Sequence, residues 1–112
     1  MISEPTATGR PKIQEQRRGI RVNSRVPVMV EWEDPSGSTV REPAFTRVVN
    51  SFGCLMVLPQ DLAVGQRFRV TNMTTAGASS GVVVWRGNQR PEGWELGMEL
   101  VQPPRDFWGL EL

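Results

Sequence analysis

The sequence predicts an all-β domain, and three observations carry that prediction. Short segments in which apolar and polar residues alternate indicate half-buried strands. Turn-forming residues separate these segments at regular spacing, as in small β-barrels and sandwiches. No stretch before Pro103 carries the 3.6-residue apolar stripe of an amphipathic helix. The 112 residues leave room for one domain.

The strands follow one another along the chain with clear turns between them. Val26 to Trp32 alternates with polar positions, and Asp34 to Gly37 supplies the chemistry of a tight turn. Pro43 predicts an edge or a bulge early in the second strand, and Gly53 ends that strand. We expect strands over residues 26–33, 39–50, 54–58, 67–71, 82–85 and 94–101, with the third buried on both faces.

The remaining segments are predicted to be connections or termini. Residues 72–81, rich in Thr, Ser, Ala and Gly, predict a hairpin loop, and residues 87–93 predict a turn. Residues 1–16 are polar and without periodicity, which indicates a flexible leader before a domain over 17–112. Residues 103–108 predict a short C-terminal helix, with Asp106 near its N-cap, or else a packed tail.

Composition excludes several classes of function. The chain has one cysteine, Cys54, and no histidine, which removes an internal disulfide, histidine-based nucleophilic catalysis and a typical zinc site. We therefore expect no enzyme activity, no metal and no cofactor. No secretory signal or membrane-spanning segment is visible, so we expect a cytoplasmic domain without membrane insertion.

Positive charge is concentrated at the N-terminus. Residues 1–25 carry six basic side chains against two acidic ones, whereas acids outnumber bases in the rest of the chain. Twelve of the thirteen basic residues are arginines, whose planar guanidinium suits phosphates and guanine edges. A basic arm of this kind predicts an anionic partner.

Three segments of the chain resemble the PilZ family of small bacterial β-barrels, many of which sense cyclic di-GMP. Arg17 and Arg21 match the family's RxxxR arm, which precedes the first strand. Residues 48–55 stand where the family has its [D/N]xSxxG motif, and residues 93–100 are similar to its closing strand. The resemblance covers roughly residues 16–110 and implies a six-stranded antiparallel barrel with a flexible basic arm.

The second motif departs from the family pattern. Val48 stands at the family's aspartate or asparagine and Asn50 at its serine, and Gly53 is retained. A valine accepts no hydrogen bond from a guanine N–H. Because a hydrogen bond to a charged group is worth roughly 1.5–3 kcal/mol, its loss predicts binding about ten- to a hundredfold weaker. A shifted alignment would use Asn50 and Ser51 as the polar pair, but Gly53 would then lie too close to them.

The resemblance implies a regulatory domain that binds cyclic di-GMP and signals to a protein partner by ordering residues 10–25. The ligand-binding residues that it implies are Arg17, Arg18, Arg21, Asn50, Ser51 and Gly53. The substitutions in the second motif favour an alternative, a PilZ-like adaptor that binds no nucleotide and acts by protein contacts alone. A DNA- or RNA-binding barrel is disfavoured, because the body of the chain is acidic.

Several further residues are given structural roles. Cys54, among apolar neighbours, is expected to be a buried and unreactive thiol. Trp85 and Trp94 are expected in the core or the barrel wall, although both could also stack on a base. Glu95 and Glu99 are expected to be surface acids with no shared chemistry.

Overall fold

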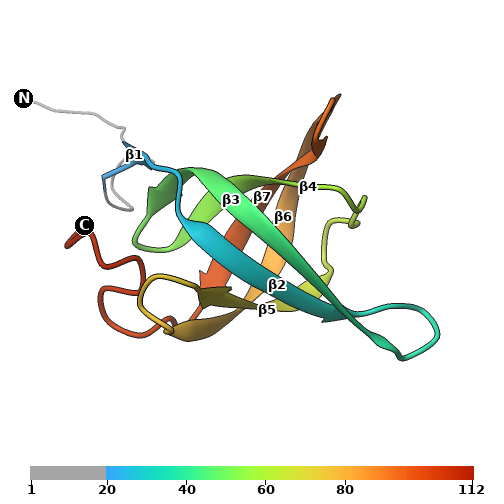
Figure 1. The fold of residues 1–112 in the computed structure, drawn as a ribbon, viewed down its shortest axis with the longest axis horizontal. Coiled ribbons are helices and arrows are strands. Elements are labelled where there is room, and N and C mark those ends of the chain that lie inside the picture. Colours follow the sequence, from blue (N-terminus) through green and yellow to red (C-terminus); the bar gives the residue numbers. More distant parts are fainter. Residues whose placement is uncertain (1–19) are drawn as a thin grey trace, which may run out of the picture.

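Residues 20–112, the part of the chain that the computed structural model describes, form an antiparallel β-barrel (Figure 1). The strands are β1 (Val22–Asn23), β2 (Pro27–Glu33), β3 (Thr39–Asn50), β4 (Gly53–Leu58), β5 (Arg67–Asn72), β6 (Ala78–Arg90) and β7 (Gly93–Val101). Six of them close in the order β2-β3-β4-β7-β6-β5, because β2 pairs with β5 and β3 also pairs with β4. The all-β class and the six-stranded barrel predicted from the sequence are confirmed.

The extra strand, β1, lies where the sequence predicts only a flexible arm. Val22 pairs with Val49, and Asn23 pairs with Val48, so β1 continues the β2 side of β3. Thr46 of β3 bridges the break between β1 and β2: its hydroxyl donates to the Ser24 carbonyl at 2.6 Å. This pairing joins the end of the predicted arm to the barrel.

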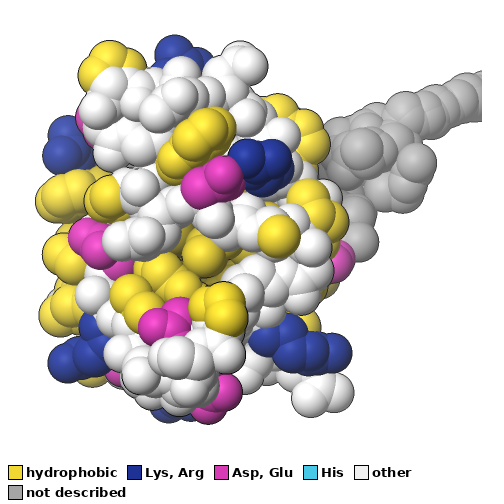
Figure 2. All heavy atoms as spheres, turned by 90° about the vertical axis from the view of Figure 1, so that its right-hand side faces the viewer, with side chains coloured by type: hydrophobic (Ala, Val, Ile, Leu, Met, Phe, Trp, Pro, Cys, Tyr) yellow, Lys and Arg dark blue, Asp and Glu magenta, His cyan; other side chains and the backbone are white. Residues whose placement is uncertain are grey.

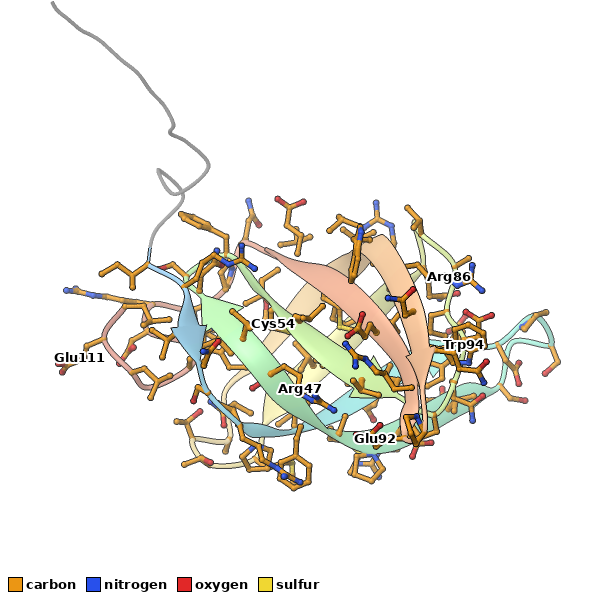
Figure 3. All side chains as sticks on the ribbon, turned by 90° about the horizontal axis from the view of Figure 1, so that it is seen from above. Arg47, Cys54, Arg86, Glu92, Trp94 and Glu111 are labelled. Atoms are coloured by element: carbon orange, nitrogen blue, oxygen red, sulfur yellow. The ribbon has the colours of Figure 1, made fainter. Side chains whose placement is uncertain are left out.

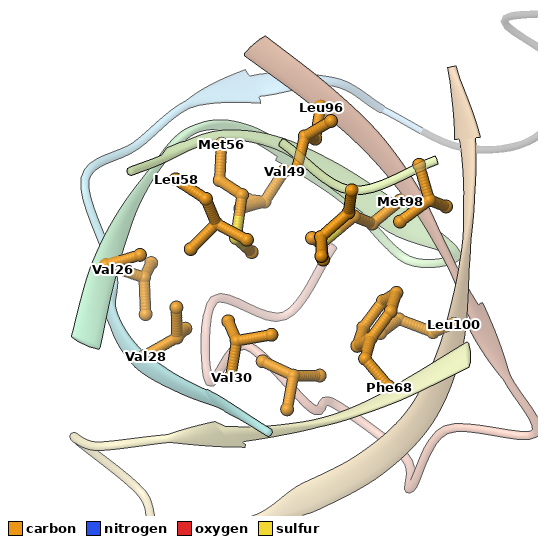
Figure 4. Close-up of a cluster of buried hydrophobic side chains, with 14 of the residues drawn as sticks. Val26, Val28, Val30, Val49, Met56, Leu58, Phe68, Leu96, Met98 and Leu100 are labelled. Carbon is orange, nitrogen blue, oxygen red and sulfur yellow. The ribbon is translucent and has the colours of Figure 1, made fainter. Parts of the chain in front are cut away.

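Alternation builds the core from β2 and its neighbours. In β2 the even-numbered residues from Val28 to Trp32 are buried and the odd-numbered ones point outward, as period two requires. Side chains from all six barrel strands meet inside (Figure 4). The fully buried members with no exposed area are Val30, Val49, Met56, Leu58, Val83 and Leu96.

The β6–β7 hairpin is longer than the sequence predicts. β6 begins at Ala78, inside the predicted loop, and continues to Arg90, inside the predicted turn. Small residues at its start are required by packing: a Cβ at Gly81 would overlap the Phe68 ring. Part of this Thr/Ser/Ala/Gly-rich segment is therefore a strand, in which a small residue leaves room for a large aromatic side chain. Only the rest of the segment is a loop.

The two ends of the barrel differ. At one end, the C-terminal segment forms turns instead of the helix considered above, and it buries Phe107 and Trp108 in edge-to-face contact. Asn72, fully buried, donates from Nδ2 to the Phe107 carbonyl at 3.0 Å. The β2–β3 and β6–β7 hairpins project at the other end, where Figure 2 shows hydrophobic side chains in a hollow ringed by charged ones.

Two features are absent from the described residues. Within residues 20–112 no group of three or more Cys, Asp or Glu side chains could hold a metal ion. In the same part of the chain, no helix is long and apolar enough to cross a membrane.

Candidate functional site

A pocket of about 790 Å³ lies on the outer face of the barrel where β3, β4, β7 and β6 run side by side. Arg21, just before β1, stands at its rim with an exposed side chain. Strand register arranges much of the lining in two parallel rows, because directly paired residues of neighbouring strands point to the same side of a sheet.

The first row is polar. Asn50 of β3 pairs with Gly53 of β4, and Gly53 pairs with Glu99 of β7. Arg21 adjoins Asn50, since the next residue, Val22, pairs with Val49. Gly53 contributes no side chain, so the floor between the Asn50 amide and the Glu99 carboxylate is backbone. A cation, an amide and an anion thus share one edge of the pocket.

The second row is apolar. Val48 of β3 pairs with Leu55 of β4, Leu55 pairs with Gly97 of β7, and Gly97 pairs with Trp85 of β6. A Cβ at Gly97 would lie 3.0 Å from the Trp85 Cβ, so this glycine gives the indole room against the sheet. Leu55 and Trp85 thus offer hydrophobic contact on the two sides of Gly97, where only backbone lines the row.

Asn50 organises the turn between β3 and β4. Its Oδ1 accepts a hydrogen bond from the Phe52 amide at 2.8 Å, the geometry of an Asx turn. Its backbone carbonyl accepts from Trp108 Nε1 at 2.8 Å, which joins the pocket wall to the C-terminal segment. Oδ1 therefore takes part in the turn, and the side-chain amide N–H groups on Nδ2 are the ones that Asn50 can donate to a ligand.

Gly53 has a structural explanation that is independent of any ligand. A Cβ at this position would collide with the Met98 carbonyl, because β4 and β7 approach closely here. The glycine of the resemblance is therefore required by strand packing. Its presence supports the barrel and says little about binding.

The predicted site residues have different positions. Arg21, Asn50 and Gly53 line the pocket together, although they come from two separate sequence segments. Ser51 is half-buried in the β3–β4 turn and does not line the pocket. Arg17 and Arg18, with the whole of the predicted leader, lie outside the described residues.

Trp85 was expected in the core or the barrel wall, and it lies in the wall, on the outer face of β6. The residue is 49% exposed and lines the pocket. The cause is a bulge between Val83 and Trp85, which shifts the register of β6 against β7. Val83 faces inward, and the next residue, Val84, is also 49% exposed. Because of the bulge, Trp85 lies on the outer face as well, opposite Gly97. A bulge of this kind leaves no mark in the alternation pattern.

Glu95 was expected to be a surface acid, and it is buried. Its Oε2 accepts from Arg90 Nε at 2.7 Å, and its Oε1 accepts from the Asn88 amide. The hydrogen bond from Arg90 is the main reason why the pKa of this carboxyl is lowered. The pair stabilises the β6–β7 hairpin and lies outside the pocket lining.

Two further ion pairs of the described residues tie down the hairpin. Arg47 donates to Glu92 at 2.9 Å, and Arg86 forms a bidentate pair with Asp61 while lying over the Trp94 ring. Figure 3 shows Arg86, Trp94 and Glu92 on one side of the molecule and Cys54 toward the other. These charged side chains form ion pairs that hold the hairpin in place.

Cys54 packs against the core from beneath the pocket. The side chain is half-buried, and burial raises the pKa of its thiol to about 12. The thiol therefore stays protonated at neutral pH, which makes it a poor nucleophile.

Comparison with known proteins adds no assignment. A scan against protein-family models finds no match for this chain, and a search of curated proteins finds none either. The geometry of the pocket is therefore the main support for any statement of function.

Proposed function

We propose that this chain is a bacterial PilZ-type regulatory domain that binds cyclic di-GMP in the pocket between Arg21 and Trp85. The supporting observation is that Arg21 of the basic segment and Asn50 of the second motif line one pocket. The two residues are far apart in the sequence, and the β1–β3 pairing is what joins them. A domain of this kind acts in the cytoplasm by passing the ligand signal to a protein partner.

The chemistry of the pocket suits a cyclic dinucleotide. The guanidinium of Arg21 can hold a phosphate through two parallel N–H donors. The Trp85 indole and the apolar row offer a surface for a planar base, and such stacking is worth about 1–3 kcal/mol per base. The pocket volume of about 790 Å³ lies within the usual range of ligand sites, roughly 300–1,000 Å³.

Val48 sets the expected strength of binding. It stands in the apolar row opposite Leu55, so position 48 offers a ligand no hydrogen-bond acceptor. We expect binding weaker by about ten- to a hundredfold than with an acceptor at this position.

A thermal-shift titration with cyclic di-GMP tests the proposal. Ligand at about 100 times its dissociation constant stabilises the folded state by ≈ 2.7 kcal/mol, which raises the melting temperature by roughly 10–20 °C. The double variant Arg17→Ala/Arg21→Ala should lose this shift.

A matched control separates a specific site from general charge. The variant Arg67→Ala/Arg69→Ala removes two exposed arginines from β5, outside the pocket lining, and should keep the full shift. A flat titration of the wild-type domain at millimolar ligand would refute nucleotide binding. Equal loss in both variants would show that the arginines act only through net charge.

A nucleotide-independent adaptor is the second candidate, and the exposed apolar rim favours it. Phe52, Val84 and Trp85 are 42%, 49% and 49% exposed around the pocket. Apolar side chains gathered in this way often mark a protein-binding surface. A flat titration with cyclic di-GMP, together with loss of a protein partner in Trp85→Ala, would establish this reading instead.

A further inference from the structure

Glu99 provides a hydrogen-bond acceptor in the pocket, where the side chain at position 48 offers none. It lies on β7 directly across from Gly53 and lines the pocket in the same row as Asn50. Because Gly53 has no side chain, no side chain separates the Glu99 carboxylate from Asn50 in that row. Glu99 as a residue is half-buried.

The chemistry of a carboxylate selects among nucleobases. An ionised carboxylate only accepts hydrogen bonds, and its two oxygens can take two parallel N–H groups. Guanine carries such a pair on its Watson–Crick edge, the N1–H and the exocyclic N2–H₂. Adenine has an unprotonated N1 on that edge, whose lone pair a carboxylate repels.

We propose that Glu99 is the specificity-determining residue of the pocket and accepts the N1–H and N2–H of a bound guanine. This inference rests on the proposed function, since it concerns the base of the same ligand. Arg21 then faces a phosphate at the rim, while the Trp85 side of the pocket contacts the plane of the base. This acceptor lies on β7, two strands away from position 48 on β3.

The sequence around position 48 cannot reveal this acceptor. Glu99 is separated from the second motif by more than forty residues, and only the β4–β7 pairing makes them neighbours. Alternation in residues 94–101 puts Glu99 on the outer face together with Glu95 and Gly97, without distinguishing their roles. The register distinguishes them, because Gly53 lies opposite Glu99 alone.

Isothermal titration with two cyclic dinucleotides tests the inference. Wild-type protein should bind cyclic di-GMP and prefer it to cyclic di-AMP. The variant Glu99→Gln keeps the shape of the side chain and changes its hydrogen-bonding pattern. It should bind cyclic di-GMP about 10- to 100-fold more weakly, because a bidentate base contact discriminates by roughly 1–3 kcal/mol.

The same variant should gain affinity for cyclic di-AMP. A glutamine amide can accept from the adenine N6–H₂ and donate to N1, whereas an ionised carboxylate has no N–H to donate to N1. Glu33→Gln is the matched control, since Glu33 is exposed on β2 outside the pocket lining, and it should leave both affinities unchanged. A cooperative melting transition of each of the three proteins without ligand shows that folding is intact.

Three results would overturn the inference. Failure of the wild-type protein to bind cyclic di-GMP refutes it together with the proposed function. Wild-type binding that Glu99→Gln leaves unchanged refutes the role of Glu99 alone and leaves the proposed function standing. Equal weakening of both dinucleotides in Glu99→Gln shows that the residue shapes the pocket without reading the base.

Discussion

Thr46 attaches the segment that carries Arg21 to the barrel, and Thr46→Val should loosen that attachment. Its hydroxyl accepts from the Val26 amide at 2.9 Å and donates to the Ser24 carbonyl at 2.6 Å. The residue has no exposed area. Valine has nearly the same shape, so the change opens no cavity. It removes both hydrogen bonds, and the buried Val26 amide is left without this partner.

The structure sets the size of the effect. A buried polar group left without a partner costs about 1–3 kcal/mol. Ser24 is only half-buried, so its carbonyl can regain part of this from water. We therefore expect a loss of about 2–4 kcal/mol, which lowers the melting temperature by roughly 10–30 °C in a domain of this size.

Thermal denaturation followed by circular dichroism measures this loss. Thr71→Val is the matched control, because Thr71 is half-buried on β5 and points away from the core. Its effect should stay within about 0.5 kcal/mol. If Thr46→Val melted as the control does, the hydroxyl bridge would contribute nothing, and the account of how β1 is held in place would be wrong.

Three further predictions concern the pocket and its supports. Gly53→Ala should destabilise the domain by about 2 kcal/mol or more in chemical denaturation, because the new Cβ collides with the Met98 carbonyl. The pKa of Glu95 is lowered by its bond from Arg90. Its contribution to stability is therefore present above the unfolded value of 4.5 and is lost as the pH falls below it. Melting temperatures between pH 6 and pH 3 should fall more steeply for the wild-type protein than for Glu95→Gln, and parallel curves would contradict this. Val48→Asp should tighten cyclic di-GMP binding by about tenfold or more in isothermal titration, and an unchanged affinity would mean that position 48 does not contact the ligand.

Alternation and turn chemistry alone predict much of the barrel. The strand β2 alternates cleanly, and β7 does so from Leu96 to Leu100, since each has one face in the core and one outside. The turn at Asp34 forms as its residues indicate, with the Asp34 carboxylate accepting from the Ser36 and Ser38 amides. These features depend on interactions between near neighbours, so a linear pattern contains them.

Features that depend on register required the tertiary structure. The bulge that exposes Trp85, the hydroxyl bridge at Thr46 and the burial of Glu95 all arise from contacts between distant segments. The sequence indicates that Arg21 and Asn50 are polar residues in candidate motifs. Only the β1–β3 pairing brings them to one pocket, and the β4–β7 pairing adds Glu99. Hydrogen bonding between strands, and not spacing along the chain, decides which side chains share a face.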